Sequence, residues 1–180
     1  ESAKQGIALE VYVGEYNQIF QETYQPGSGL NQFKPDAVFY FCQFDRLIPH
    51  KGVSAIVESD IEELDKKIVD LYHQFRDQQN SLFVFSNFIV PISFPYSNLP
   101  SDDLSQSLNN FNQKLNLSFQ SLENACVFDL ESLAQFHGKS SITHPLLKFS
   151  SDLYFSESFM VEVGKKLATV VKSYKSKAKK

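Results

Sequence analysis

Four short runs of apolar residues recur along the chain, and they predict buried β-strands. The runs span Ile7 to Val13, Asp36 to Cys42, Ser81 to Asn87 and Ala125 to Leu130. They are rich in valine and phenylalanine, and their hydrophobicity is nearly continuous rather than alternating. This pattern is typical of strands that are covered on both faces, and it favours a parallel sheet.

Three longer segments have apolar residues at spacings of three and four, as on one face of an α-helix. They run from Ile61 to Phe75, from Leu104 to Leu122 and from Phe159 to Tyr174. Ser59 and Glu62 have the spacing of a capping box at the start of the first segment. The alternation of strands and helices predicts an α/β fold of three layers, α/β/α, around a mainly parallel, doubly wound sheet. Segments 26–35 and 91–103 are rich in glycine or proline, and we expect loops there.

The length and charge of the chain limit its class. Its 180 residues fit one domain, which we assign to residues 1–171. A net charge of -4 gives no general attraction to nucleic acid or to an anionic membrane. The basic run at 172–180 is more typical of a helix end or linker than of a binding patch. Without a signal peptide or a run of 18 apolar residues, we expect a soluble, cytoplasmic protein.

The residues most often used in metal and covalent chemistry form no known motif. Cys42 and Cys126 each lie in an apolar run, where a small buried side chain is expected rather than a disulfide. The four histidines have no carboxylate partner at the spacing of a zinc site, so no metal is expected. The glycine-rich motifs of nucleotide sites and the G-x-S-x-G elbow are absent from the sequence, so we expect no cofactor in this domain.

In a parallel sheet, ligands bind beyond the carboxyl ends of the strands. The predicted strands therefore direct attention to the segments that follow them. These segments are 14–17, 43–46, 87–91 and the region from Asp129 onward.

Several blocks of the sequence together resemble one family. They are "VGEYNQIFQETYQPGSGLNQFKPDAVFYF", "FSNFIVP", "VFDLESLAQFHG" and the segment from His144 to the last residue. In this order they are similar to the N-terminal region of FkbH-like proteins. The resemblance implies an SGNH-hydrolase-like domain that precedes a haloacid-dehalogenase-like phosphatase domain. It further implies that the first strand of the fold, which carries the nucleophile, lies before Glu1, and that residues 172–180 lead toward the phosphatase-like domain.

The resemblance also implies an activity. FkbH-like proteins take a phosphorylated three-carbon acid, typically 1,3-bisphosphoglycerate, remove its phosphate, and load the acyl group onto an acyl carrier protein for polyketide assembly. The partners implied are therefore the acyl carrier protein and the phosphatase-like domain.

One position argues against hydrolysis by this domain. Laid on the D-x-x-H motif of SGNH enzymes, Asp152 matches the aspartate, and Phe155 stands where the histidine is expected. A phenyl ring cannot accept a proton, so it cannot activate a hydroxyl group. His144 is the one histidine placed to substitute, although a surface loop histidine is the favoured reading. We expect Phe155 to pack on Met160 beside a helix start that Asp152 or Ser156 caps.

Other candidate site residues each have a structural alternative. Gly29 matches the loop glycine that donates an oxyanion N–H, but a turn glycine with positive φ explains it as well. Asp45 is placed near the SGNH asparagine, although a helix cap is favoured. Asn87 follows a strand directly and either donates to an oxyanion or forms a turn. Tyr16 and Asn17 are candidates to line the cleft. For Tyr16, a core tyrosine with a hydrogen-bonded hydroxyl is an equally good explanation.

Three functional hypotheses remain from the sequence. The favoured one is a catalytically degenerate SGNH-like domain of an acyl-loading protein. The second is an active acyltransferase or esterase whose nucleophile lies before Glu1. The third is a protein-interaction module without a small-molecule pocket.

Overall fold

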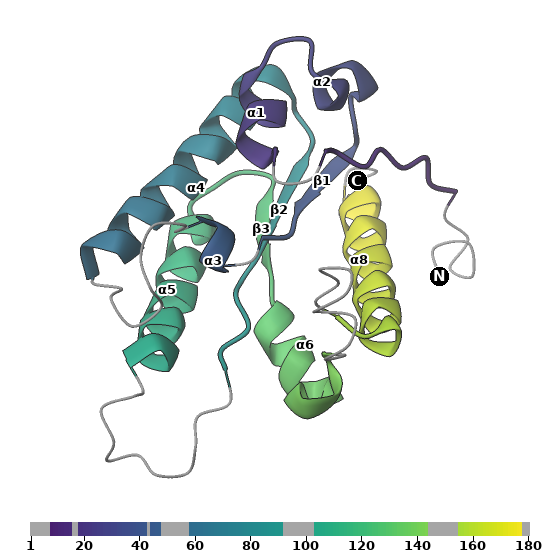
Figure 1. The fold of residues 1–180 in the computed structure, drawn as a ribbon. Helices are drawn as coiled ribbons and strands as arrows, with labels where there is room; N and C mark the ends of the chain where they lie inside the picture. The colour runs from purple at the N-terminus through teal and green to yellow at the C-terminus, as the bar shows by residue number, and fades with distance from the viewer. Residues whose placement is uncertain are drawn as a thin grey trace. The chain divides into compact units, whose positions relative to one another are not determined.

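The structure is a computed structural model, and it describes residues 8–15, 18–42, 44–47, 58–91, 103–143 and 155–177. The chain divides into two compact units. One comprises residues 12–129, and the other comprises residues 1–11 together with 130–180. Figure 1 shows the elements of both units along the chain.

A parallel sheet forms the centre of the unit 12–129. Its strands are β1 (Ala37–Tyr40), β2 (Leu82–Ser86) and β3 (Ala125–Phe128), in the order β1-β2-β3. Both pairs are parallel, with Ala37 beside Leu82 and Phe83 beside Ala125. Three of the four predicted strands are thus confirmed as parallel neighbours, and the α/β class is confirmed with them.

The fourth predicted strand, Ile7 to Val13, is wrong over its described part. Residues 8–15 lie in no helix or strand. Leu9, Val11 and Val13 are 48%, 71% and 83% exposed. A strand exists only where a neighbour takes up its backbone hydrogen bonds, and an apolar run alone does not supply that neighbour.

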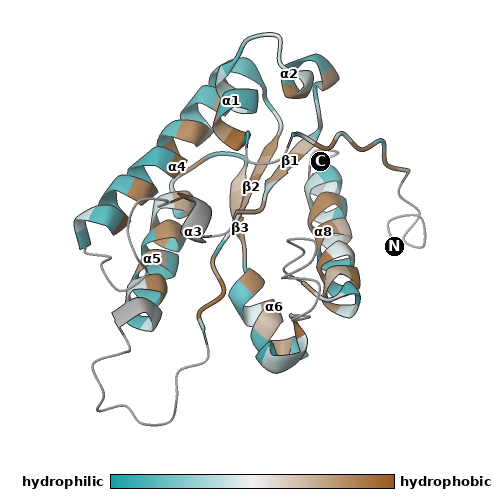
Figure 2. Cartoon of the chain, in the orientation of Figure 1, coloured by the Kyte–Doolittle hydropathy of each residue, from teal (hydrophilic) through white to brown (hydrophobic). Residues whose placement is uncertain are grey.

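Five helices in the described part of this unit accompany the sheet. They are α1 (Ile19–Tyr24), α2 (Gly29–Phe33), α3 (Phe44–Leu47), α4 (Glu58–Gln78) and α5 (Asp103–Gln120). The long helices α4 and α5 contact each other. In Figure 2 they alternate between apolar and polar residues along their length, whereas the strands are mostly apolar. This matches the amphipathic pattern that predicted both helices.

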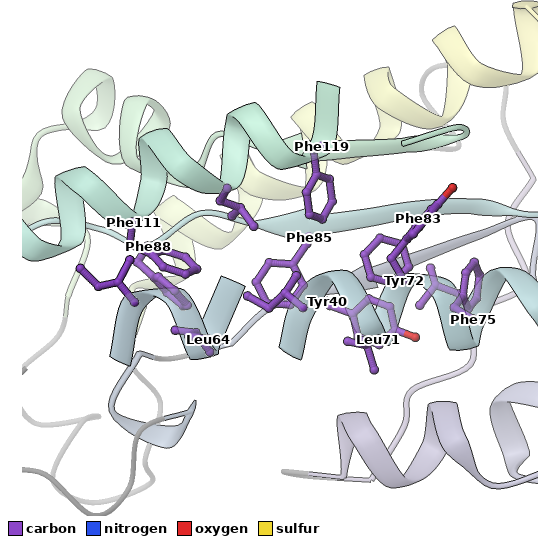
Figure 3. Close-up of a cluster of buried hydrophobic side chains, with 14 of the residues drawn as sticks. Tyr40, Leu64, Leu71, Tyr72, Phe75, Phe83, Phe85, Phe88, Phe111 and Phe119 are labelled. Atoms are coloured by element: carbon purple, nitrogen blue, oxygen red, sulfur yellow. The ribbon is translucent and has the colours of Figure 1, made fainter. Parts of the chain in front are cut away.

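The core lies between the sheet and these two helices. Figure 3 shows side chains from α4, from α5 and from the strands meeting there. Phe83 on β2 has ring contacts with Tyr72 and Phe75 of α4 at centroid distances of 5.5 Å and 5.4 Å, and with Phe119 of α5 at 5.9 Å. Aromatic pairs at such distances add stabilisation beyond the area they bury. These contacts hold the central strand against both helices.

Several predicted boundaries differ from the structure. Helix α4 begins at Glu58, so Ser59 lies inside the first turn and is not its cap. Helix α2 occupies part of the predicted loop 26–35, because Gly27 supplies a turn at φ 88° and the Ser28 hydroxyl caps the helix by accepting from the N–H of Asn31. Most of the second predicted loop, 91–103, lies outside the described residues. Strand β3 ends at Phe128, two residues before the predicted end.

The second unit contains α6 (Leu130–His137), the short 3-10 helix η4 (Lys139–Ser141) and α8 (Glu157–Lys177). Ser156 caps α8, since its Oγ accepts from the N–H of Phe159 at 3.4 Å. Of the two predicted caps, Ser156 is confirmed, and Asp152 lies outside the described residues. Helix α8 continues to Lys177, through most of the basic run. No helix in the described ranges is long and apolar enough to cross a membrane.

Candidate functional site

A hydrogen-bonded pair marks the carboxyl edge of the sheet. Asn87 follows β2, Asp129 follows β3, and the Nδ2 of Asn87 donates to the Oδ1 of Asp129 at 2.7 Å. Asn87 is 3% exposed, whereas Asp129 is exposed. Because an ionised carboxylate only accepts hydrogen bonds, the nitrogen of the amide must face it, which sets the amide orientation. The pair therefore presents an oriented carboxylate at the edge where ligands bind to parallel sheets.

The backbone beside this pair is held from two directions. The N–H of Asn87 donates to the carbonyl of Phe128 at 3.1 Å, which extends the β2–β3 hydrogen bonding by one residue. The side chain of Asn112 on α5 accepts from the N–H of Phe88 at 2.9 Å and donates to its carbonyl at 2.8 Å. Asn112 is 7% exposed and Phe88 is 3% exposed. Buried bonds of this kind fix residues 87 and 88 and so preorganise the edge.

The last residue of β2 has an unusual environment. Ser86 is 1% exposed, and its hydroxyl has no hydrogen-bond partner among the described residues. Ser86 pairs with Phe128, and the Phe128 ring lies 5.6 Å from the ring of Phe41, edge to face. Phe41 follows β1 and Phe128 ends β3, so the two rings come from the strands on either side of Ser86. A small side chain on the central strand leaves room for this contact.

Cys42 lies at the same edge, but its thiol is a poor nucleophile. Burial raises the pKa of Cys42 to about 12. The thiolate is the reactive form, and at neutral pH this thiol remains protonated. Burial likewise raises the pKa of Cys126. Both cysteines are free thiols, as predicted, but each is half-buried rather than fully buried.

Gly29 is explained by a close contact. A Cβ at this position would lie 2.1 Å from the hydroxyl oxygen of Tyr12. That hydroxyl donates to the Oε2 of Glu22 at 3.2 Å, and the same carboxylate oxygen accepts from the N–H of Leu30 at 3.1 Å. Gly29 begins α2, and among the described glycines positive φ belongs to Gly27 and Gly138. The reading of Gly29 as a turn glycine with positive φ is therefore wrong.

The structure does not bring Gly29 and Asn87 together. Gln79, which lies shortly before β2, donates through its Nε2 to the Oδ1 of Asn31 at 2.9 Å. Helix α2 therefore lies near the amino ends of the strands, whereas Asn87 follows the carboxyl end of β2.

The remaining predicted site residues are not placed. Tyr16, Asn17, His144 and Asp152 lie outside the described residues. Asp45 falls in α3, and its side chain is likewise outside the description.

Phe155 is placed, and its ring contacts another aromatic ring. Its ring centroid lies 5.2 Å from that of Phe159, which is fully buried. The predicted packing partner, Met160, is 49% exposed, so the buried neighbour in contact with the Phe155 ring is Phe159, and packing on Met160 stays a prediction. Phe159 lies four positions after Phe155 and Met160 lies five, and residues four apart are neighbours on one face of a helix.

Two residues of this edge were not predicted individually. Asp129 was included only as the start of a segment after a strand, and its polar character directly after the apolar run was the available signal. Asn112 gave no signal, because it is one of several asparagines on a predicted helix.

Features that would support other kinds of site are few in the described ranges. No group of three or more His, Cys, Asp or Glu residues there is placed to hold a metal ion. An open hollow on the surface is lined by Tyr24 of α1 and by Asp70, His73 and Gln74 of α4. Burial and the charge of Asp70 raise the pKa of Tyr24.

Comparison with known proteins gives a family and a fold. The family model described as the FkbH N-terminal domain matches residues 1–172. A solved structure with a TM-score of 0.66 and 18% identity is the crystal structure of the N-terminal part of the protein BF1531 from Bacteroides fragilis, containing a phosphatase domain complexed with Mg. The match covers 86% of this chain and 42% of that one, so this chain matches less than half the length of that crystallised chain. No curated protein matches.

Proposed function

The chain belongs to the FkbH N-terminal domain family, and on that premise we propose that it is the SGNH-like, three-layer domain of a cytoplasmic acyl-loading protein. In this proposal a linked haloacid-dehalogenase-like domain removes phosphate from a phosphoglycerate-derived acyl donor. The domain described here then positions the glyceryl thioester of an acyl carrier protein for polyketide-type biosynthesis. The crystallised N-terminal part of the Bacteroides protein contains a phosphatase domain, and this chain matches 42% of that crystallised chain, which supports such a linkage.

The observation that carries this proposal is that the Phe155 ring packs against another ring at the position where a catalytic base is expected. This residue occupies the place of the base in the D-x-x-H motif, and its ring packs on the buried ring of Phe159 at 5.2 Å. A side chain used for packing and unable to accept a proton does not activate water or a hydroxyl group. A domain of this kind serves acyl transfer best by holding a thioester without hydrolysing it.

The oriented carboxyl edge supports the same role. Positioning of a reacting group requires rigid side chains, because misplacement by about 1 Å costs roughly a hundredfold in rate. Asn87 and Phe88 are fixed by hydrogen bonds to β3 and α5. The edge thus offers fixed polar groups without a reactive thiol, since the pKa of Cys42 is raised by burial to about 12.

The first test is hydrolysis of p-nitrophenyl acetate by the chain. We expect no turnover above the buffer rate, no change in His144→Ala, and no gain in Phe155→His, because the ring of Phe155 lies against Phe159 rather than at a nucleophile. Turnover that His144→Ala abolishes would show that the domain is an active esterase.

The second test concerns the carrier protein. We expect the chain to bind a glyceryl-loaded acyl carrier protein more tightly than the unloaded carrier, with the thioester intact by mass spectrometry after incubation. Equal binding of both forms would contradict acyl positioning and would favour a plain interaction module.

A further inference from the structure

The hydroxyl group of Ser86 is buried without a hydrogen-bond partner. Ser86 ends the central strand β2, is 1% exposed, and its Oγ bonds to no other group in the described part of the chain. Burying a hydroxyl group that makes no hydrogen bond costs free energy. Alanine would leave the same room for the neighbouring side chains without that cost, so packing does not explain a serine at this position.

The register of the sheet shows what surrounds this hydroxyl. Ser86 pairs with Phe128 of β3, and continuing the pairing of β1 with β2 by one residue places Phe41 on its other side. Residues paired across a parallel sheet point to the same face, so these three side chains share one face. The rings of Phe41 and Phe128 are 5.6 Å apart between centroids, although their strands lie on either side of β2. The two rings therefore meet across the strand that carries the hydroxyl.

These surroundings restrict what the hydroxyl binds. A buried water molecule needs roughly two to four polar partners, and aromatic rings supply none. A charged ligand group would lose its hydration beside the rings at a high cost in free energy. A serine hydroxyl donates one hydrogen bond, so a neutral group with an acceptor oxygen fits best. Phe41 is 37% exposed and Phe128 is 6% exposed, so the ring of Phe41 is the one that can turn outward to admit such a group.

Resting on the function proposed above, we propose that the Ser86 hydroxyl donates a hydrogen bond to the carbonyl oxygen of the acyl thioester. The acyl chain enters at the carboxyl end of β2, where ligands bind to parallel sheets. The rings of Phe41 and Phe128 pack on the atoms that flank the carbonyl. Ser86 binds and aligns the thioester without forming a covalent bond to it, so the thioester stays intact.

The experiment measures the binding of two probes to the chain by calorimetry. One is glyceryl-pantetheine thioester, and the other is the thioether in which a methylene group replaces the carbonyl. We expect the wild type to prefer the thioester by about tenfold, which corresponds to one hydrogen bond, and Ser86→Ala to bind both probes equally. Ser81→Ala is the matched control. It makes the same change at a residue that is 7% exposed and precedes the other end of β2, and it should keep the preference.

The unfolding temperature without ligand gives a second readout. Ser86→Ala should raise it by about 2 °C, because the variant no longer buries an unpaired hydroxyl. A serine whose hydroxyl served the fold through an internal hydrogen bond would have the opposite effect. A lower unfolding temperature in Ser86→Ala would therefore assign the hydroxyl a structural role and would overturn its role in binding.

The binding results separate this inference from the proposed function. Equal binding of both probes by the wild type, or a preference that persists in Ser86→Ala, would overturn the role of Ser86 while leaving acyl positioning in place. Loss of the preference in Ser81→Ala as well would also overturn it, since the effect would not depend on the hydroxyl at the carboxyl end. Failure of the wild type to bind either probe would overturn both this inference and the proposed function.

Discussion

At the scale of single residues, Gly29 is required by the space that a neighbouring side chain occupies, and not by an unusual backbone conformation. Its Cα lies against the hydroxyl of Tyr12, which also bonds to Glu22 and whose ring stacks on Phe33 at a centroid distance of 5.7 Å. Burial and the carboxylate of Glu22 together raise the pKa of Tyr12. The tyrosine thereby ties residue 12, at the entry to this unit, to helix α2.

This contact predicts that the effect of Gly29→Ala on the free energy of unfolding changes sign when Tyr12 is removed. Gly29→Ala should destabilise the wild type by about 1 kcal/mol, because the new Cβ displaces the Tyr12 ring and its hydrogen bond is lost. In a Tyr12→Ala background the same substitution should stabilise by about 0.5 kcal/mol, because alanine is the better helix former and the space is then open. Urea unfolding of the four proteins measures both effects. A destabilisation of equal size in both backgrounds would mean that Tyr12 is not the cause.

At the scale of elements, one side chain connects α5 to the segment after β2. The amide of Asn112 satisfies both the N–H and the carbonyl of Phe88. No backbone pairing in the described sheet does this for residue 88, because β2 ends at Ser86. The amide of Asn112 thus takes the place of the backbone hydrogen bonds that residue 88 would make if the strand continued.

Asn112→Ala should therefore be costly for its size. It leaves two buried backbone groups without partners, which predicts a loss of about 2–4 kcal/mol in the free energy of unfolding. Asn110→Ala, on an exposed position of the same helix, is the control and should change stability by less than about 0.5 kcal/mol. Chemical denaturation gives both values, and hydrogen exchange at the Phe88 amide should accelerate only in Asn112→Ala. Similar losses of unfolding free energy in the two variants would show that helix propensity, and not the bonds to Phe88, causes the effect.

At the scale of the whole molecule, buried neutral groups predict how stability depends on pH. The pKa of Cys42 rises from 9.0 to about 12 on folding because the thiolate is desolvated, and burial also raises the pKa of Tyr40. Between pH 9 and 12 the unfolded chain has released the Cys42 proton while the folded chain retains it. Unfolding is therefore favoured as the pH rises through this window, by up to about 1.4 kcal/mol per pH unit for each such group.

Removing the thiol should flatten this dependence. We expect Cys42→Ala to show a smaller fall in the urea midpoint between pH 8 and about 10.5 than the wild type, even if it is less stable at pH 8. Tyr40→Phe is the comparison, and it should affect the dependence only above about pH 10, where free tyrosine begins to ionise. Parallel curves for wild type and Cys42→Ala would show that the thiol ionises as readily in the folded state as in the unfolded chain.

The sequence by itself determined the features that depend on neighbouring residues along the chain. Continuous apolar runs identified the strands ending near Cys42, Asn87 and Phe128, since a strand buried on both faces has no polar alternation to interrupt it. Helical spacing identified α4, α5 and α8 for the same local reason. Blocks of residues in a fixed order identified the family, which the match over residues 1–172 confirmed.

Only the tertiary structure decided what depends on partners distant in sequence. Residues 8–13 have the composition of a strand but lie in none, because strand formation depends on a neighbour's backbone. The bonds from Asn87 to Asp129 and from Asn112 to Phe88 join residues 42 and 24 positions apart, and no local pattern encodes which polar side chains will meet. That Phe159 is the buried neighbour of Phe155 was decided by which face of α8 is buried, a property of packing that spacing alone does not give.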